Sequence, residues 1–190
     1  LGYPVFQTFS EVQVKADVIV DFSNPALLLS MLDYAKSTNT AVVISTTGLS
    51  DEQIKTVEDY SKEIPVFFSY NMSMGVSLLC ELAKTAAKVL GNDFDIEIVE
   101  AHHNQKKDAP SGTAMTAFEV IANELDRDPE EVGVFGRKGL VGKRTSEEIG
   151  VHAIRGGDIV GDHTVMFVGD GERLEVKHQA HTREVFIAGV

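Results

Sequence analysis

The chain has 190 residues, of which 43% are hydrophobic and 24% are charged, which is enough for one or two compact domains. Its net charge of −12 argues against nucleic acid as a partner, and no apolar run is long enough to span a bilayer. The sequence begins at Leu1 rather than Met and stops at Val190, so we expect a fragment, or a chain whose ends are absent. Cys80 has no second cysteine to pair with and is expected to be a buried thiol in a reducing compartment.

The first 70 residues alternate between strand and helix patterns. Three apolar runs predict strands: residues 16–22, 41–44 and 65–68. The first run is apolar enough to predict a strand buried on both faces. Asn24 and Pro25 are typical of a helix start, and Ser50 with Gln53 forms a capping box at a second start. This β-α-β-α-β order predicts a parallel sheet with right-handed crossovers.

Each of these strands ends in small or polar residues. The three ends are residues 21–23, 45–47 and 69–71. In open parallel sheets, ligands bind outside the carboxyl ends of the strands, so these ends are candidate binding loops. Ordinary turn chemistry is the alternative for any single end, because Ser, Thr and Asn are common in turns.

A long apolar helix is predicted over residues 73–90, with Gly91 just past its end. We place a change of domain at its start. The predicted domains are residues 1–72 and 73–182, with residues 183–190 beginning a return to the first domain.

Residues 95–113 combine a strand, a cluster of polar groups and a helix start. Residues 95–101 alternate as a strand, and Ser111 is a good N-cap for a helix over residues 111–125. The first amides of that helix, at Gly112 and Thr113, would be unpaired at its positive end and suit a carboxylate or a phosphate. The adjacent His102 and His103 add groups that titrate near neutral pH, and Lys106 and Lys107 add positive charge. We therefore expect a site for an anionic substrate with acid–base chemistry.

Other interpretations of the paired histidines remain open. Neighbouring residues on a strand point to opposite faces, so one histidine could be in the core and the other solvated. A metal site is not expected, because no further Cys or His stands at ligand spacing nearby.

Residues 126–148 are polar and glycine-rich, which predicts an exposed loop or flap. Its basic residues are interpreted as a solvated surface rather than a functional patch: Arg137, Lys138, Lys143 and Arg144. Strands are then predicted at residues 149–154, 159–168 and 173–180, the last two forming a hairpin around Gly169 to Glu172. With residues 94–101 they would form a mainly antiparallel sheet in an α+β domain.

Four histidines lie in the last third of the chain: His152, His163, His178 and His181. Their spacing matches no standard metal site, so we assign them to strand pairing and subunit contacts.

The stretch from His102 to Thr113 resembles the signature of the dihydrodipicolinate reductase family, His-His-x-x-Lys-x-Asp-Ala-Pro-Ser-Gly-Thr, at every fixed position. Residues 21–25 resemble the family's Asp-Phe-[Ser/Thr]-x-Pro, and residues 45–48 its Gly-Thr-Thr-Gly turn, with Ser45 in place of the first glycine. Residues 155–163 resemble a third family stretch, Arg-x-Gly-x-x-Val-Gly-x-His.

The resemblance implies an α/β protein with a Rossmann-like cofactor domain, whose N-terminal part is missing here, and an α+β substrate and oligomerisation domain. It implies NAD(P)H-dependent reduction of 4-hydroxy-tetrahydrodipicolinate to tetrahydrodipicolinate with loss of water, in the diaminopimelate route to lysine. The cofactor would be NADH or NADPH, and the partner a cyclic dicarboxylate substrate. The family likeness also implies a cytoplasmic homotetramer assembled through the second sheet.

The matching positions imply roles for individual residues. His102 would be the acid and Lys106 would assist it, while His103, Lys106, Ser111, Gly112 and Thr113 would bind the substrate. Residues expected at the nicotinamide side of the cofactor are Ser45, Thr46, Thr47, Ser69, Tyr70, Asn71 and Met72.

One expected feature of a dinucleotide fold is missing from the sequence. No Gly-x-Gly-x-x-Gly turn is present, and in the family that segment lies upstream of where this sequence begins. This leaves two alternatives open: a truncated, non-catalytic relative that binds dicarboxylates or supports an oligomer, and a Rossmann dehydrogenase acting on another oxo or imino acid.

Overall fold

The computed structural model describes residues 2–187 and 189, which form two compact units. One unit ends at Tyr70 and the other runs from Asn71 to Gly189. The predicted limits 1–72, 73–182 and 183–190 stay a proposal, and residues 188 and 190 of the last segment lie outside the described residues.

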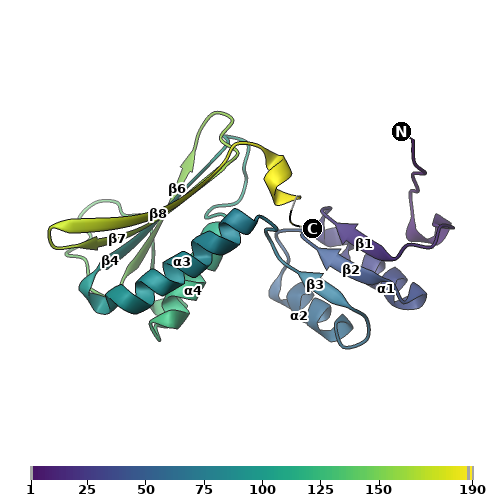
Figure 1. Cartoon of the computed structure of the whole chain (residues 1–190), viewed down its shortest axis with the longest axis horizontal. Helices are drawn as coiled ribbons and strands as arrows, with labels where there is room; N and C mark the ends of the chain where they lie inside the picture. Colours follow the sequence, from purple (N-terminus) through teal and green to yellow (C-terminus); the bar gives the residue numbers. More distant parts are fainter. Residues whose placement is uncertain (1, 188, 190) are drawn as a thin grey trace. The chain divides into compact units, whose positions relative to one another are not determined.

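The first unit has the predicted alternation of strands and helices (Figure 1). Its elements are η1 (Phe9–Glu11), β1 (Val18–Asp21), η2 (Pro25–Leu27), α1 (Leu28–Thr38), β2 (Ala41–Ile44), α2 (Asp51–Tyr60) and β3 (Val66–Phe68). The strands pair in the order β1-β2-β3, all parallel, as predicted. Asn24 caps η2 through Ala26 N at 2.9 Å, and Ser50 and Gln53 form the predicted capping box of α2.

Helices α1 and α2 cover one face of this sheet. Leu32, Val42 and Ile44 are buried in the core between them. On the opposite face Val18 and Val20 are each 46% exposed. The prediction that the first strand is buried on both faces is therefore wrong, because among the described residues both helices lie on the side of Ile19.

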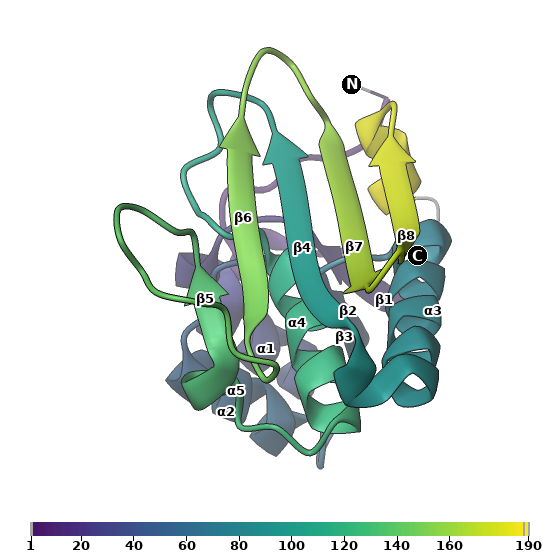
Figure 2. The same ribbon diagram turned by 90° about the vertical axis from the view of Figure 1, so that its left-hand side faces the viewer.

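The second unit is built around a five-stranded sheet (Figure 2). Its elements are α3 (Met74–Leu90), η3 (Gly91–Asp93), β4 (Asp95–His102), α4 (Gly112–Glu124), α5 (Pro129–Val132), β5 (Gly133–Phe135), β6 (Ile149–Arg155), β7 (Gly161–Gly169), β8 (Glu172–Ala180) and η4 (Arg183–Phe186). The strand order is β5-β6-β4-β7-β8. An α+β unit with the predicted hairpin is confirmed.

The sheet predicted to be mainly antiparallel is mixed, with two antiparallel and two parallel strand pairs among the described residues. Strand β7 pairs antiparallel with β8, as the predicted hairpin requires, and it also pairs antiparallel with β4. Strands β5 and β6 instead run parallel with the sheet's central strand β4. After β4 the chain passes through α4 and comes back as β5 and β6, on the side of β4 away from β7. Neighbouring parallel strands need a crossover connection of this kind, and β6 accordingly runs parallel with β4.

Helices α3 and α4 lie on the same face of this sheet, as both ribbon views show (Figures 1 and 2). Alternate residues of β4 point toward them, so Ile96 and Ile98 are fully buried beside Phe118 and Ile121 of α4. The same alternation carries Glu100 and His102 to the buried face at the carboxyl end of β4. The core thus ends where the polar site begins.

Residues 126–148 are more structured than the predicted exposed loop. They contain α5 and β5, and Val132 is buried. Among the described residues, no helix combines the length and the apolar character needed to cross a membrane.

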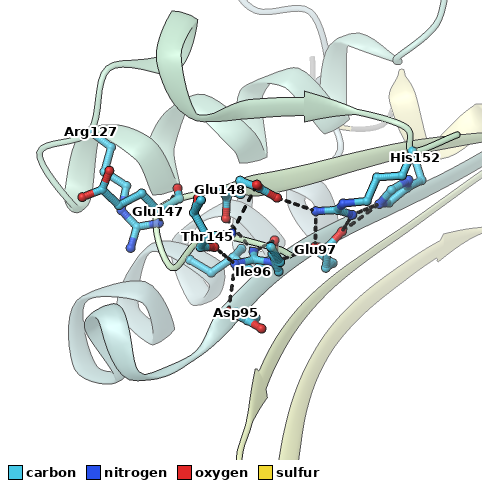
Figure 3. Close-up of polar contacts among 10 residues, drawn as sticks. Asp95, Ile96, Glu97, Arg127, Thr145, Glu147, Glu148 and His152 are labelled. Atoms are coloured by element: carbon cyan, nitrogen blue, oxygen red, sulfur yellow. Dashed lines mark hydrogen bonds and ion pairs between the residues drawn. The ribbon is translucent and has the colours of Figure 1, made fainter. Parts of the chain in front are cut away.

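The prediction that Arg137 and Arg144 belong to a solvated surface is wrong, because both are paired with Glu97. Arg137 donates to both carboxylate oxygens of Glu97, each at 2.9 Å, and Arg144 Nε donates to Glu97 Oε1 at 3.1 Å. His152 Nε2 donates to Glu97 Oε2 at 2.7 Å, and Glu148 accepts a further bond from Arg137 (Figure 3). These contacts attach the 136–148 segment to the sheet face that α3 and α4 leave uncovered.

Candidate active site

The helix start predicted to bind an anion is present. Ser111 is the N-cap of α4, and its Oγ accepts from Ala114 N at 3.3 Å. Gly112, the first residue of the helix, is exposed and has no side chain to screen its amide. The first amides of a helix have no partner within it and carry the positive end of the helix dipole. This end of α4 can therefore receive a carboxylate.

Glu100 connects this helix start to His102. Its Oε1 accepts from Ser111 N at 3.0 Å, and its Oε2 accepts from His102 Nδ1 at 2.7 Å. Arg155 donates to both oxygens, at 2.8 and 2.7 Å. Burial alone would raise the pKa of Glu100, but the hydrogen bonds from His102 and Arg155 outweigh it and hold the pKa at about 2. Glu100 is therefore ionised at neutral pH.

His163 lies between the same groups. Its Nε2 is 2.9 Å from Ser111 Oγ in a hydrogen bond, and its ring packs edge-on against His102 with centroids 5.2 Å apart. Burial lowers the pKa of His163 to about 4, so the ring is neutral at neutral pH. Its Nδ1 is buried and has no hydrogen-bond partner among the described residues. The assignment of His163 to strand pairing and subunit contacts therefore omitted its contact with the site.

Two other predicted site residues lie in separate contacts. Lys106 Nζ donates to Asp108 Oδ1 at 2.8 Å, and its side chain is one-fifth exposed. His103, which follows the end of β4, accepts from Arg183 Nη2 at 3.1 Å. It lines an open cavity of about 340 Å³ with Asn104, Gln105, Gly157, Asp158, Val160 and Arg183. Among the described residues no hydrogen bond joins His103 or Lys106 to Ser111.

Thr113 and Asn71, predicted for substrate and for cofactor respectively, are in contact. Asn71 Nδ2 donates to Thr113 Oγ1 at 3.0 Å, and Asn71 Oδ1 accepts from Ser73 N at 2.9 Å. Asn71 therefore ties the start of α3 to the start of α4. Met72, between Asn71 and the α3 N-cap Ser73, is buried.

In the first unit the predicted strand ends lie along one edge of the sheet. Ser45 N donates to Asp21 O at 2.8 Å, and Ser69 N donates to Ile44 O at 3.0 Å. Thr46 Oγ1 donates to Asp21 Oδ2 at 2.8 Å, so that hydroxyl is already engaged. Further along this edge, Thr47 is exposed, while Tyr70 packs edge-on against Phe68.

The hydroxyl of Ser45, on this edge of the sheet, has unused hydrogen-bonding capacity. Its Oγ is buried and has no hydrogen-bond partner within the described part of the chain. A buried hydroxyl without a partner is costly, so it is suited to a ligand that supplies one. The strand ends thus fit a polar ligand at the carboxyl edge of the sheet.

Sequence reasoning missed Glu100, Arg155 and His163 as members of the site. The available signal was the family-like stretch at residues 155–163, which contains both Arg155 and His163. In the part of the chain that the structure describes, no group of three or more His, Cys, Asp or Glu residues is placed to hold a metal ion.

Two family models match the chain. The model described as "Dihydrodipicolinate reductase, N-terminus" matches residues 1–72, and "Dihydrodipicolinate reductase, C-terminus" matches residues 75–190. The chain is 64% identical over 180 residues to a 4-hydroxy-tetrahydrodipicolinate reductase of Methanobrevibacter smithii, covering 93% of this chain and 65% of that protein. It is 49% identical over 191 residues to one of Clostridium novyi, covering 100% of this chain and 74% of that protein.

Solved structures give a consistent result. A dipicolinate-bound dihydrodipicolinate reductase from a Paenisporosarcina species superposes with a TM-score of 0.65 at 28% identity, covering 91% of this chain and 65% of that one. A probable dehydrogenase from Thermotoga maritima, at 11% identity and a TM-score of 0.54 over 92% of this chain and 60% of that one, shares the fold alone. The chain therefore spans somewhat less than two thirds of the Methanobrevibacter relative and of the Paenisporosarcina structure.

Proposed function

The chain belongs to the dihydrodipicolinate reductase family, and from this membership we propose that the protein reduces 4-hydroxy-tetrahydrodipicolinate to tetrahydrodipicolinate. The reaction consumes NADH or NADPH, releases water and lies on the diaminopimelate route to lysine. The observation that carries the proposal is the exposed start of α4, joined through Glu100 to a buried imidazole. A dicarboxylate substrate needs such amides, and its reduction needs a proton donor.

The proposed substrate contacts are assigned from the hydrogen-bonding capacity that each group still has. The amides of Gly112 and Thr113 take one carboxylate at the start of α4. Ser111 supports them as the cap, because its Oγ already bonds Ala114 N and His163. His103 and Lys106 bind the second carboxylate or the ring nitrogen. The dipicolinate bound to the similar Paenisporosarcina protein is a diacid of the same class.

His102 is the proposed proton donor and Lys106 its assistant. After hydride reaches the substrate ring, the electron-rich product of that step must gain a proton, which His102 Nε2 supplies. Lys106 stabilises negative charge as it develops. Because Lys106 is paired with Asp108, substrate binding has to draw its ammonium away or use its remaining N–H groups.

The bound nicotinamide cofactor supplies the hydride. Its proposed contacts are Ser45, Thr46, Thr47, Ser69, Tyr70, Asn71 and Met72. The unpartnered hydroxyl of Ser45 and the polar strand ends fit the amide of a nicotinamide. Either NADH or NADPH is compatible with these residues.

We also propose a cytoplasmic homotetramer. The sheet face opposite α3 and α4 exposes apolar side chains, among them Ile154 and Val168, each at least 36% exposed. A second copy of the chain would cover them. Light scattering coupled to gel filtration tests this, and a monomer at micromolar concentration contradicts it.

Cofactor oxidation, followed at 340 nm with freshly generated substrate, tests the function. His102→Gln and Lys106→Ala are each expected to lower kcat at least about 10²-fold. Lys107→Ala, an exposed neighbour of the same charge, is the matched control and retains the wild-type rate. Wild-type rates in both test variants would overturn the role assignment. Binding of dipicolinate with no turnover by the intact protein would favour the non-catalytic alternative.

A further inference from the structure

Glu100 accepts two hydrogen bonds in addition to the two from its ion-pair partner Arg155. Its side chain is completely buried, and each oxygen accepts two hydrogen bonds. Oε1 accepts from Ser111 N and Arg155 Nη2, while Oε2 accepts from His102 Nδ1 and Arg155 Nη1. The carboxylate is therefore fixed by Arg155 in one orientation, with one oxygen on the proposed proton donor and the other on the proposed anion site.

We propose that Glu100 is a positioning residue: it holds the proton of His102 on Nδ1 and directs Nε2, the other ring nitrogen, to the substrate. An ionised carboxylate is acceptor-only, so the nitrogen facing it must carry a hydrogen. Nε2 is then the atom that gives up a proton and regains one from solvent. This inference rests on the proposed function for its chemistry and on the Glu100 contacts for its geometry.

The surroundings of His102 favour the same assignment. Among the described residues, His102 Nε2 has no hydrogen-bond partner. It is also absent from the fully buried polar atoms that lack a partner, so this nitrogen is not sealed inside the core. A Cβ added at Gly161 would lie 3.1 Å from Nε2, so the glycine keeps space open beside this nitrogen. The ring of His163 packs against His102 at an interplanar angle of 72°, which limits its rotation.

The proton balance is simple. The charged ring of His102 carries hydrogens on both nitrogens, and transfer of the Nε2 proton to the reduced substrate leaves a neutral ring protonated at Nδ1. The carboxylate of Glu100 keeps its charge throughout, as the aspartate does in hydrolase triads. No proton has to pass through Ser111 or His163.

Nitrogen NMR tests the geometry independently of any activity. In protein labelled with ¹⁵N-histidine, the neutral His102 ring should show a protonated Nδ1 and an unprotonated Nε2. The opposite tautomer in the wild-type protein overturns the proposal. Assignment uses the His102→Gln variant, in which the signal disappears. Because this measurement needs no substrate or cofactor, its result stands even if the proposed reaction is not observed.

Kinetics test the consequence, with a matched pair of variants. Glu100→Gln should lower kcat about 10²-fold while KM changes less than about threefold, since His102 loses its fixed orientation but the α4 amides remain. Glu97→Gln is the control: Glu97 is on the same strand and also bonds arginine and histidine, but it lies outside the site. Equal loss of kcat in both variants, or wild-type kcat in Glu100→Gln, overturns the positioning role.

If Glu100→Gln does not fold, a second variant, Arg155→Lys, tests the same proposal. Arg155→Lys keeps a positive charge near Glu100 but loses the two-pronged contact. It should lower kcat with an intermediate effect, and the His102 tautomer should become mixed in the same spectra. A mixed tautomer with wild-type kcat in Arg155→Lys would show that the orientation of the His102 ring does not affect the reaction and would overturn the proposal.

Discussion

Glu97 and Glu100 project from opposite faces of β4, and each carboxylate is held by arginine and histidine. Glu97 bonds Arg137, Arg144 and His152 on the face that the helices leave open, as Figure 3 shows for its labelled partner His152. Glu100 bonds Arg155 and His102 on the buried face. The three-residue separation places them on opposite faces because side chains alternate along a strand. One strand thus anchors a surface segment with one carboxylate and the proposed proton donor with the other.

The Glu97 cluster should make the second unit sensitive to acid. Burial would raise the pKa of Glu97, but its bonds to Arg137, His152 and Arg144 hold it at about 2, below the usual 4.5. A depressed carboxyl pKa stabilises the fold above the unfolded pKa, and this stability is lost as pH falls from about 4.5 toward 2. The full effect is at most about 3 kcal/mol.

Urea unfolding between pH 5 and pH 2.5 measures this effect. Glu97→Gln should be less stable than wild type at pH 5, and the difference should shrink at pH 2.5. Glu100 contributes to the pH dependence of stability in the same pH window. In Glu97→Gln the slope of the unfolding free energy against pH should therefore be reduced rather than abolished. A difference that stays constant across this range contradicts the assignment.

Gly150 should be required because Glu97 occupies the space of its missing side chain. The two residues are paired across β4 and β6, and a Cβ on Gly150 would lie 1.8 Å from Glu97 Oε2. We expect Gly150→Ala to cost about 1–3 kcal/mol, since the fixed carboxylate has to move. In a Glu97→Ala background the cost should be smaller, giving a coupling energy in a double-mutant cycle. Gly156→Ala, with open space around its Cβ, is the control, and additive effects would disprove the coupling.

His163 should produce a second pH transition at higher pH. Burial lowers its folded pKa from 6.5 to about 4, so the folded state favours the neutral ring. Between these values the unfolded chain binds more protons, and stability falls as pH drops from about 6.5 to 4, by at most about 3 kcal/mol. His163→Gln removes this titration and should flatten the stability curve in that window. An unchanged slope in the variant would indicate that His163 is not buried neutral.

Local features of this fold could be predicted because they depend on neighbours in sequence. Ser111 as the cap of α4 and the Ser50–Gln53 capping box are set by residues three apart. The alternation of β4 follows from its own apolar pattern. The residues of the signature were expected together for the same reason, since they lie within twelve positions of one another.

The missed contacts depend on sheet register, which spacing does not reveal. Glu100 lies opposite His163 on β7 and beside Ala153 on β6, and this brings Arg155 and His163 to the site. Arg137 and Arg144 were interpreted as solvated because they lie in a polar loop, yet they pair with Glu97 40 or more residues away. A one-residue change in register would move all of these side chains to the other face.

Ser111 should contribute more to stability than Ser73, although both cap a helix. Ser111 Oγ accepts from Ala114 N at 3.3 Å and Ser73 Oγ from Val76 N at 3.4 Å, and both residues are buried. Losing either cap should cost about 1 kcal/mol. Ser111→Ala also leaves the buried Nε2 of His163 without a partner, which adds about 1–3 kcal/mol.

Urea unfolding of Ser111→Ala and Ser73→Ala at pH 7.5 measures the difference, because His163 is neutral there. The excess cost of Ser111→Ala should largely disappear in a His163→Phe background, where no ring nitrogen remains to be satisfied. Ser111→Thr, which keeps the hydroxyl, should restore most of the stability. Equal losses for the two alanine variants would mean that the Ser111–His163 hydrogen bond contributes nothing to the fold beyond the cap.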